Sequence, residues 1–160
     1  MKRILLVVAL SSAAFAARAS DSDFRPASTS EYGWVKPQAA GAGGLTRVQV
    51  VAPKKSLKVY RLWDSNGVSA NRAKEFGAFW GDFSPKSESA ARTAWAVCKE
   101  WNHMDMLTVC ELPAGTAVAK GPGQTATCKN GKTLRGGPQQ IVIANPQTKL
   151  KNCRRGSSAF

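Results

Sequence analysis

Alternating apolar and polar residues predict two short β-strands early in the chain, over residues 46–51 and 57–63. Pro53 and the two lysines after it interrupt the pattern between them, and proline is unfavourable in the middle of a strand. Further strands are expected over 107–112, over 116–120 and from Gln140 onward. The chain therefore begins and ends with strand-forming segments.

A helical period lies between these two groups of strands. Ser84 and Pro85 are typical of a helix N-terminus, and apolar side chains recur at helical spacing as far as Trp101. A shorter helix is predicted over 69–76. Because strands precede and follow one main helix, the order predicts an α+β fold.

The first residues have the composition of a secretory signal peptide. A positive start at Lys2 and Arg3, an apolar run over 4–10 and small residues around Ala19 match the three parts of such a signal. The apolar run is too short to cross a bilayer as a helix. We expect residues 1–19 to be cleaved, and the mature chain to be secreted or periplasmic without a membrane span.

The rest of the chain divides by composition into an arm and a domain. Residues 20–44 are rich in Ser, Ala, Gly and Pro, which is typical of a flexible arm. Tyr32 and Trp34 are the side chains that can pin this arm to the domain. Residues 45–160 are expected to form a single catalytic or binding domain, whose length suits one hydrophobic core.

Four cysteines predict two disulfide bonds, because an even number after a signal peptide indicates disulfides more often than metal. They are Cys98, Cys110, Cys128 and Cys153. No pair has C-x-x-C spacing and the chain has one histidine, so no metal site is expected. Of the three pairings, we favour Cys98–Cys110 with Cys128–Cys153, because the first bridge joins the helix to the next strand. Each bridge is expected to add roughly 2–4 kcal/mol.

The net charge of the full chain is +13, and removal of the signal peptide with its three cations leaves a strongly basic protein. A basic exported protein can bind nucleic acid, an anionic surface or a phosphate-bearing ligand. The cations are spread along the chain instead of forming one stripe, which argues against a dedicated nucleic-acid interface.

Arg61 stands out because it falls on the apolar face of its strand, in register with Val59 and Trp63. A buried guanidinium is costly unless its charge and its donors are matched. One interpretation is an ion pair with Asp64 or Glu111. The other is an anion-binding arginine in a cleft, where its fork suits phosphate or carboxylate.

Two further stretches are candidates for a site. Residues 77–84 hold three aromatic side chains between glycines, which is typical of core packing or of a wall that stacks on a planar ring. Near the end, Gly136, Gly137 and Pro138 form a turn that leads into Gln140 at the start of a strand. Gln140 is therefore either a strand cap or a site residue.

In this order, the three stretches resemble the ADP-ribosyltransferase-like fold, and within it the tuberculosis-necrotising-toxin type of NAD glycohydrolase. The motifs are Tyr60-Arg61-Leu62-Trp63, Gly77-Ala78-Phe79-Trp80 and Gly136-Gly137-Pro138-Gln139-Gln140. The resemblance implies a small domain with a split, mainly antiparallel β core, one main helix and, here, disulfide staples. It implies NAD as substrate and no cofactor.

The resemblance also implies roles for individual residues. Arg61 and Gln140 would be the catalytic pair, with Arg61 on a phosphate or ribose of NAD and Gln140 on the nicotinamide ribose. The substrate-binding residues would be Tyr60, Arg72, Phe79, Trp80, Phe83 and Ser84. A glutamine in place of glutamate favours hydrolysis over ADP-ribosyl transfer. Such an exported toxin or effector would need an inhibitor or immunity protein, or an oxidation lock through its disulfides, to spare its maker.

Two other functions stay open on the sequence. The first is a basic, non-catalytic module that binds nucleic acid or an anionic envelope surface. The second is an RNase-like toxin that uses His103, Glu111 and arginines.

Overall fold

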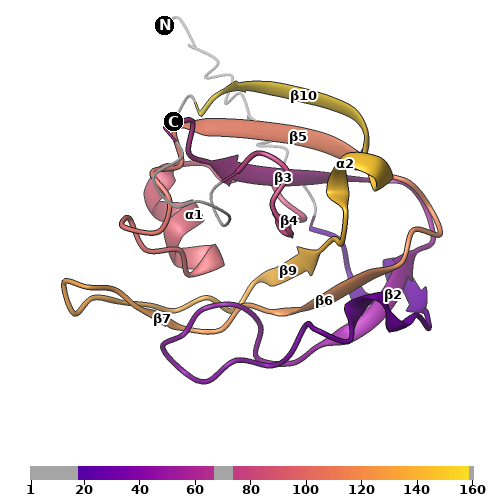
Figure 1. The fold of residues 1–160 in the computed structure, drawn as a ribbon, viewed down its shortest axis with the longest axis horizontal. Coiled ribbons are helices and arrows are strands. Elements are labelled where there is room, and N and C mark those ends of the chain that lie inside the picture. Colours follow the sequence, from indigo (N-terminus) through magenta and orange to yellow (C-terminus); the bar gives the residue numbers. More distant parts are fainter. Residues whose placement is uncertain (1–17, 67–73, 159–160) are drawn as a thin grey trace, which may run out of the picture.

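The computed structural model of the protein describes residues 18–66 and 74–158. Its centre is an eight-stranded sheet with the strand order β1-β2-β6-β9-β4-β3-β5-β10, in which neighbouring strands run antiparallel (Figure 1). The strands of this sheet are β1 (Phe24–Pro26), β2 (Gln49–Pro53), β3 (Leu57–Trp63), β4 (Phe79–Gly81), β5 (Met106–Leu112), β6 (Val118–Pro122), β9 (Gln139–Val142) and β10 (Lys151–Ser157).

The remaining elements are short. A separate two-stranded sheet pairs β7 (Ala126–Thr127) with β8 (Thr133–Leu134). The helices are α1 (Glu88–Trp95), α2 (Pro146–Lys149) and two 3-10 turns, Asp21–Asp23 and Ser30–Tyr32. A mainly antiparallel sheet with one main helix agrees with the α+β prediction. Within the described residues, no helix is long and apolar enough to span a membrane.

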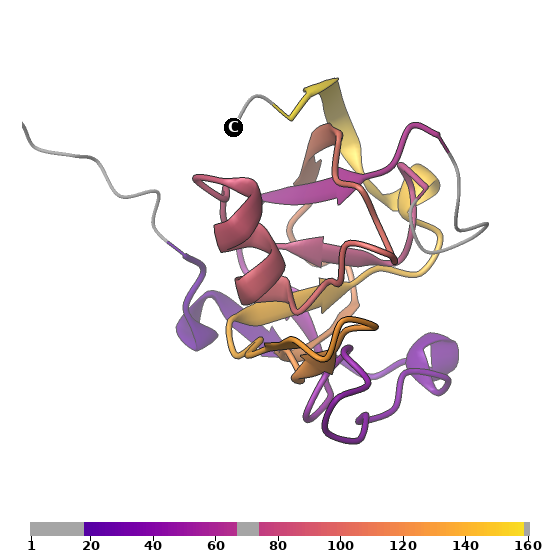
Figure 2. The same ribbon diagram turned by 90° about the vertical axis from the view of Figure 1, so that its left-hand side faces the viewer.

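The two faces of the curled sheet bury different sets of side chains. One face holds the largest apolar cluster, centred on Val59, Trp80 and Ile141. On the other face, α1 packs against the sheet through Ala91 and Trp95, and Figure 2 shows this helix in front of the strands. The strand alternation read from the sequence thus separates a core face from a face that a helix covers.

The main helix is shorter than predicted. It begins after Ser87, whose side chain accepts a hydrogen bond from the Ala90 backbone N–H, and not after Ser84. It ends at Ala96, which takes a left-handed backbone with φ of 49°. Trp101 therefore lies beyond the helix, and the apolar spacing that suggested a longer helix arises from a loop that packs against the β7–β8 hairpin.

The N-terminal segment differs from the flexible arm expected over 20–44. β1 pairs with β2 at the edge of the sheet, and Phe24, Tyr32 and Val35 are buried. Tyr32 does pin the segment, because its hydroxyl donates to the Ala117 carbonyl oxygen at 2.8 Å. Spaced single anchors in a sequence rich in small residues are enough to hold it on the domain.

The favoured disulfide pairing is wrong. The structure pairs Cys98 with Cys128 and Cys110 with Cys153. β5 and β10 are neighbours in the sheet, which brings Cys110 beside Cys153. The other bridge joins the loop after α1 to the β7–β8 hairpin. Nearness along the sequence favoured Cys110 as the partner of Cys98, but the sheet order decides otherwise.

Candidate functional site

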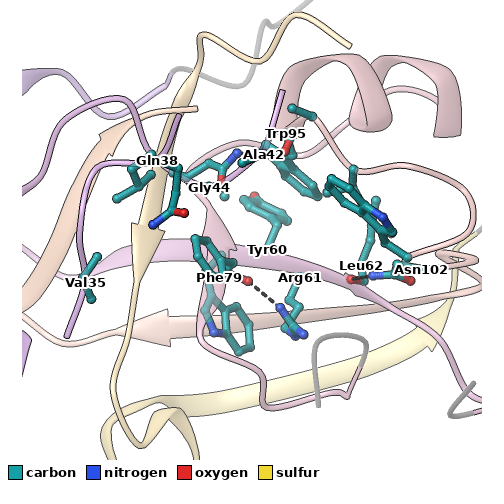
Figure 3. Close-up of a pocket in the computed structure, with 18 of the residues that line it drawn as sticks. Val35, Gln38, Ala42, Gly44, Tyr60, Arg61, Leu62, Phe79, Trp95 and Asn102 are labelled. Carbon is teal, nitrogen blue, oxygen red and sulfur yellow. Dashed lines mark hydrogen bonds between the residues drawn. The ribbon is translucent and has the colours of Figure 1, made fainter. Parts of the chain in front are cut away.

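A pocket of about 410 Å³ opens on the helix-covered face of the sheet. Its walls come from the segment 34–45, from β3 and β4, from the end of α1 with the loop after it, and from β9 (Figure 3). The aromatic side chains in its lining are those of Trp34, Tyr60, Phe79, Trp80, Trp95 and Trp101. The volume lies within the range of small-molecule sites, which are typically apolar with a few polar groups.

Sheet register assembles the centre of this pocket. Tyr60 on β3 lies opposite Gly81 on β4, and Gly81 lies opposite Gln140 on β9, so the three residues share one face across adjacent strands. Gly81 has no side chain, and a Cβ there would lie 2.2 Å from the Trp95 ring. The indole of Trp95 fills that space between Tyr60 and Gln140.

Gln140 is buried and fixed by the end of α1. Its Nε2 donates to the Trp95 carbonyl oxygen at 2.9 Å. The turn before it is anchored as well, because the Gly136 N–H donates to the Thr93 carbonyl oxygen at 3.0 Å and Gly136 has φ of 63°. Gln140 thus caps the end of α1 instead of its own strand, and it also lines the pocket.

Arg61 is buried at 5% exposure, and its guanidinium donates to two backbone carbonyl oxygens. Nη1 donates to the Phe79 carbonyl oxygen at 2.7 Å (Figure 3). Nε donates to the Lys74 carbonyl oxygen, also at 2.7 Å. Burial lowers the pKa of the guanidinium to about 10, so it stays protonated at neutral pH. The suggested acids have other partners: Asp64 pairs with His103 at 3.0 Å and Glu111 accepts from Asn152 at 2.8 Å.

The pocket brings together most of the residues singled out from the sequence. Tyr60, Arg61, Phe79, Trp80 and Gln140 all line it. Two other predicted substrate-binding residues, Phe83 and Ser84, do not belong to its lining. Phe83 lies beside a second cavity, Ser84 is exposed, and Arg72 falls outside the described residues, as does most of the predicted helix over 69–76.

Trp95 is the pocket residue that the sequence assigned to plain core. Its indole Nε1 is buried and has no hydrogen-bond partner among the described residues, although buried tryptophan donors usually have one. Its spacing on the helix is that of any core position, so no feature of the sequence distinguishes it. Gly81, which is paired with Tyr60 and Gln140, leaves the room that lets the indole pack in the pocket wall.

A second cavity of about 470 Å³ lies beside the N-terminal segment, and Tyr60 lines both cavities. Asp82, directly after β4, is 7% exposed, and its Oδ1 has no hydrogen-bond partner among the residues described. Burial raises the pKa of this carboxyl, against the opposing charges of Arg18 and Lys120. No motif or spacing in the sequence marks Asp82 as a site residue.

The residues suggested for an RNase-like site do not meet. His103 precedes β5 and pairs with Asp64, whereas Glu111 lies near the other end of β5 and accepts from Asn152. The donor atoms of Cys98, Glu100 and Cys128 lie within 4.8 Å of one another, close enough to hold a metal ion. However, Cys98 and Cys128 are joined in a disulfide bond.

No protein-family model and no curated protein matches this chain. Among solved structures, it is similar to a chain described as the structure of Tne2 in complex with Tni2. The alignment has a TM-score of 0.44 and 15% sequence identity, and it covers 75% of this chain and 97% of that one.

Proposed function

We propose that the aromatic pocket binds NAD and that the protein cleaves its nicotinamide–ribose bond. The observation that supports this proposal is the convergence of three distant stretches of sequence in one pocket. Tyr60 and Arg61, Phe79 and Trp80, and Gln140 are the residues that resemble NAD-cleaving domains, and they line the same 410 Å³ cavity.

To cleave this bond, the protein must bind the nicotinamide ring and hold the ribose in a fixed orientation. In hydrolysis, the C1′–N bond breaks, nicotinamide leaves as a neutral ring, and water adds to C1′ to give ADP-ribose and a proton. The half-exposed ring of Phe79 and the other aromatic walls suit a planar nicotinamide. Its carboxamide oxygen is a suitable acceptor for the Trp95 Nε1–H.

Gln140 has the position to orient a ribose hydroxyl or the attacking water. Its amide nitrogen is held by the Trp95 carbonyl oxygen, which fixes the plane of the amide. The carbonyl oxygen Oε1 is then a pre-positioned acceptor, and pre-positioned polar groups lower the barrier of a reaction that develops charge. A neutral amide stabilises positive charge less than a carboxylate, which favours hydrolysis over transfer to a protein side chain.

The structure changes the role proposed for Arg61. Since its guanidinium donates to the carbonyl oxygens of Lys74 and Phe79, we assign it to positioning the segment 74–79 that carries the Phe79 wall. It is a positioning residue in this proposal, and direct contact with a phosphate is not required of it.

The test is release of nicotinamide from NAD by purified, oxidised protein. Phe79→Ala is expected to raise KM about tenfold, the loss of one stacking contact, while Gln140→Leu is expected to lower kcat by about tenfold or more. Gln147→Leu is the matched control, because Gln147 is exposed on α2. The proposal is refuted if the wild type releases no nicotinamide. It is also refuted if Phe79→Ala and Gln140→Leu both release nicotinamide with the kinetic constants of the wild type.

We further propose export and an inhibitory partner that protects the producing cell. Export predicts that the mature protein begins near Ser20, which N-terminal sequencing of the extracellular or periplasmic protein checks. Full-length precursor in that fraction would contradict it. Expression of the unexported domain should deplete cytoplasmic NAD, and undiminished NAD levels would argue against the need for an inhibitor.

A basic binding module remains the second candidate because of β10. This edge strand is exposed along its whole length and carries Lys151, Arg154 and Arg155. Binding to nucleic acid that falls steeply with salt, and that is lost when these cations are replaced, would favour this function.

A further inference from the structure

We propose that the second cavity is a binding site for a phosphate ester that carries a vicinal diol, and that it takes the ADP-ribose part of NAD. The identity of the natural ligand rests on the proposed function, whereas the chemistry of the site rests on its own residues. The cavity has a volume of about 470 Å³ and combines a buried carboxylate, a group of lysines and an aromatic wall.

The carboxylate of Asp82 is the recognition group for the diol. Asp82 is more than nine-tenths buried, and its Oδ1 is without a donor among the described residues. A buried acceptor that lacks a donor costs free energy, and a ligand hydroxyl in the cavity would supply that donor. Two adjacent hydroxyls of a ribose match the two oxygens of a carboxylate.

The cations at the mouth are the recognition groups for phosphate. Lys54, Lys55 and Lys58 line the cavity from the turn between β2 and β3 and from β3 itself. All three are exposed, and none of the ion pairs found in the described parts of the chain uses them. Lysine ammonium groups bind phosphate as point charges and tolerate different geometries.

Two other charged residues line the cavity. The carboxylate of Asp23 is engaged within the N-terminal segment, because Ser20 N–H donates to Asp23 Oδ2 at 2.7 Å. Arg18 lies 4.4 Å from the centre of the Phe83 ring. The sequence predicts cleavage near Ala19, so Arg18 covers Phe83 only in the uncleaved chain. Processing there would leave the Phe83 ring and Asp82 more open to a ligand.

Tyr60 connects this cavity to the aromatic pocket, because it lines both. Phe83 packs against Trp95 with ring centres 5.5 Å apart, so the aromatic walls of the two cavities are continuous. A dinucleotide that places its nicotinamide against Phe79 can therefore extend past Tyr60 and bring its diphosphate to the lysines.

The experiment measures binding of ADP-ribose and, separately, of nicotinamide by calorimetry to the purified protein. Asp82→Asn and the double variant Lys54→Gln/Lys58→Gln are each expected to weaken ADP-ribose binding about tenfold and to leave nicotinamide binding unchanged. Asp105→Asn and Lys129→Gln/Lys132→Gln are matched controls outside both linings and should bind ADP-ribose like the wild type.

The outcomes separate this inference from the proposed function. Wild-type protein that does not bind ADP-ribose, or variants that bind it unchanged, would overturn the second site even if NAD is cleaved. If ADP-ribose binds to the wild type and binds about tenfold more weakly to the variants, the second site is supported even when no nicotinamide is released. The missing nicotinamide release would then refute only the enzymatic proposal. Should Asp82→Asn fail to fold, the two exposed lysines decide the outcome.

Discussion

Arg61 and Asp82 are two buried charged residues, one on β3 and one directly after the neighbouring strand β4, and their surroundings differ. Arg61 on β3 donates to two backbone carbonyl oxygens. Asp82 follows β4, and one of its oxygens has no donor in the part of the chain that the structure describes. Arg61, which the sequence marked as functional, is held by backbone carbonyl oxygens of the segment 74–79. Asp82, which the sequence did not mark, keeps an acceptor atom for a ligand.

The difference shows that a buried charge does not by itself indicate a ligand. Hydrogen bonds to backbone can satisfy a guanidinium fully, and it then fixes structure. A carboxylate that keeps a free acceptor in a cavity is the better candidate for binding. If this comparison is right, replacing Arg61 should mainly cost stability, and replacing Asp82 should mainly cost ligand affinity.

The largest expected effect is that of Arg61→Leu. The change removes two hydrogen bonds from a charged donor and leaves space between β3 and the segment 74–79, so we expect a loss of about 3 kcal/mol in the free energy of unfolding. Urea denaturation measures it. Arg155→Leu is the control, because Arg155 is 65% exposed and lies 3.6 Å from Glu75, and an exposed pair contributes little.

A stable Arg61→Leu protein that has lost NAD cleavage but kept the wild-type unfolding free energy would break the comparison. Arg61 would then act on substrate, as the resemblance implied, and the assignment to positioning would be wrong.

A smaller loss is expected for Gly77→Ala, through the same guanidinium. A Cβ at Gly77 would lie 2.1 Å from Arg61 Nη2, so the side chain or the segment must shift, at about 1–2 kcal/mol. The loss should shrink in the Arg61→Leu background, because the clashing atom is then gone, and a double-mutant cycle measures that coupling. Gly156→Ala, which has open space around the added Cβ, is the matched control; additive losses would contradict the mechanism.

The sequence predicted the elements of the fold better than their assembly. Alternation placed β3 and β5 almost to the residue, because each has one face in the core and such faces are visible in the pattern. The disulfide pairing was wrong because it depends on β10 lying beside β5, and nothing local in the sequence encodes that neighbour relation. The helix start was misplaced because Ser84 and Ser87 both suit a cap.

The site could be predicted in part for the same reason. Tyr60, Phe79 and Gln140 belong to local motifs, so they were found. Trp95 and Asp82 were missed because their importance comes from what surrounds them: Gly81 makes room for one, and burial without a donor distinguishes the other. Those properties exist only once the strands are paired.

A still smaller effect is expected at Asp21, the ion-pair partner of Lys120, whose charge acts on Asp82. Lys120 is fully buried and pairs with Asp21 at 2.6 Å, and this hydrogen bond lowers the pKa of Asp21. Because the folded-state pKa is lowered, the pair stabilises the fold above the ordinary value of 3.8 and loses that effect as pH falls. Asp21→Asn should therefore lower the melting temperature at pH 7 and have little effect at pH 3. An equal decrease at both pH values would mean that the carboxylate charge is not what matters.

The smallest expected effect on stability, and one of opposite sign, is that of Asp82→Asn. Burial raises the pKa of Asp82 above its ordinary value, although Arg18 and Lys120 oppose the rise, so the fold favours the protonated acid. The stabilisation that Asp82 gives to the wild-type fold is then fully present below the ordinary pKa of the carboxyl, and it is lost as the pH rises through the raised pKa of the folded state. The asparagine side chain of the variant does not titrate, hence the variant should melt at the wild-type temperature near pH 3 and slightly above it at pH 7, as calorimetry would measure. A variant that is less stable at pH 7 would show that the carboxylate is satisfied inside the protein, and Asp82 would then resemble Arg61 instead of contrasting with it.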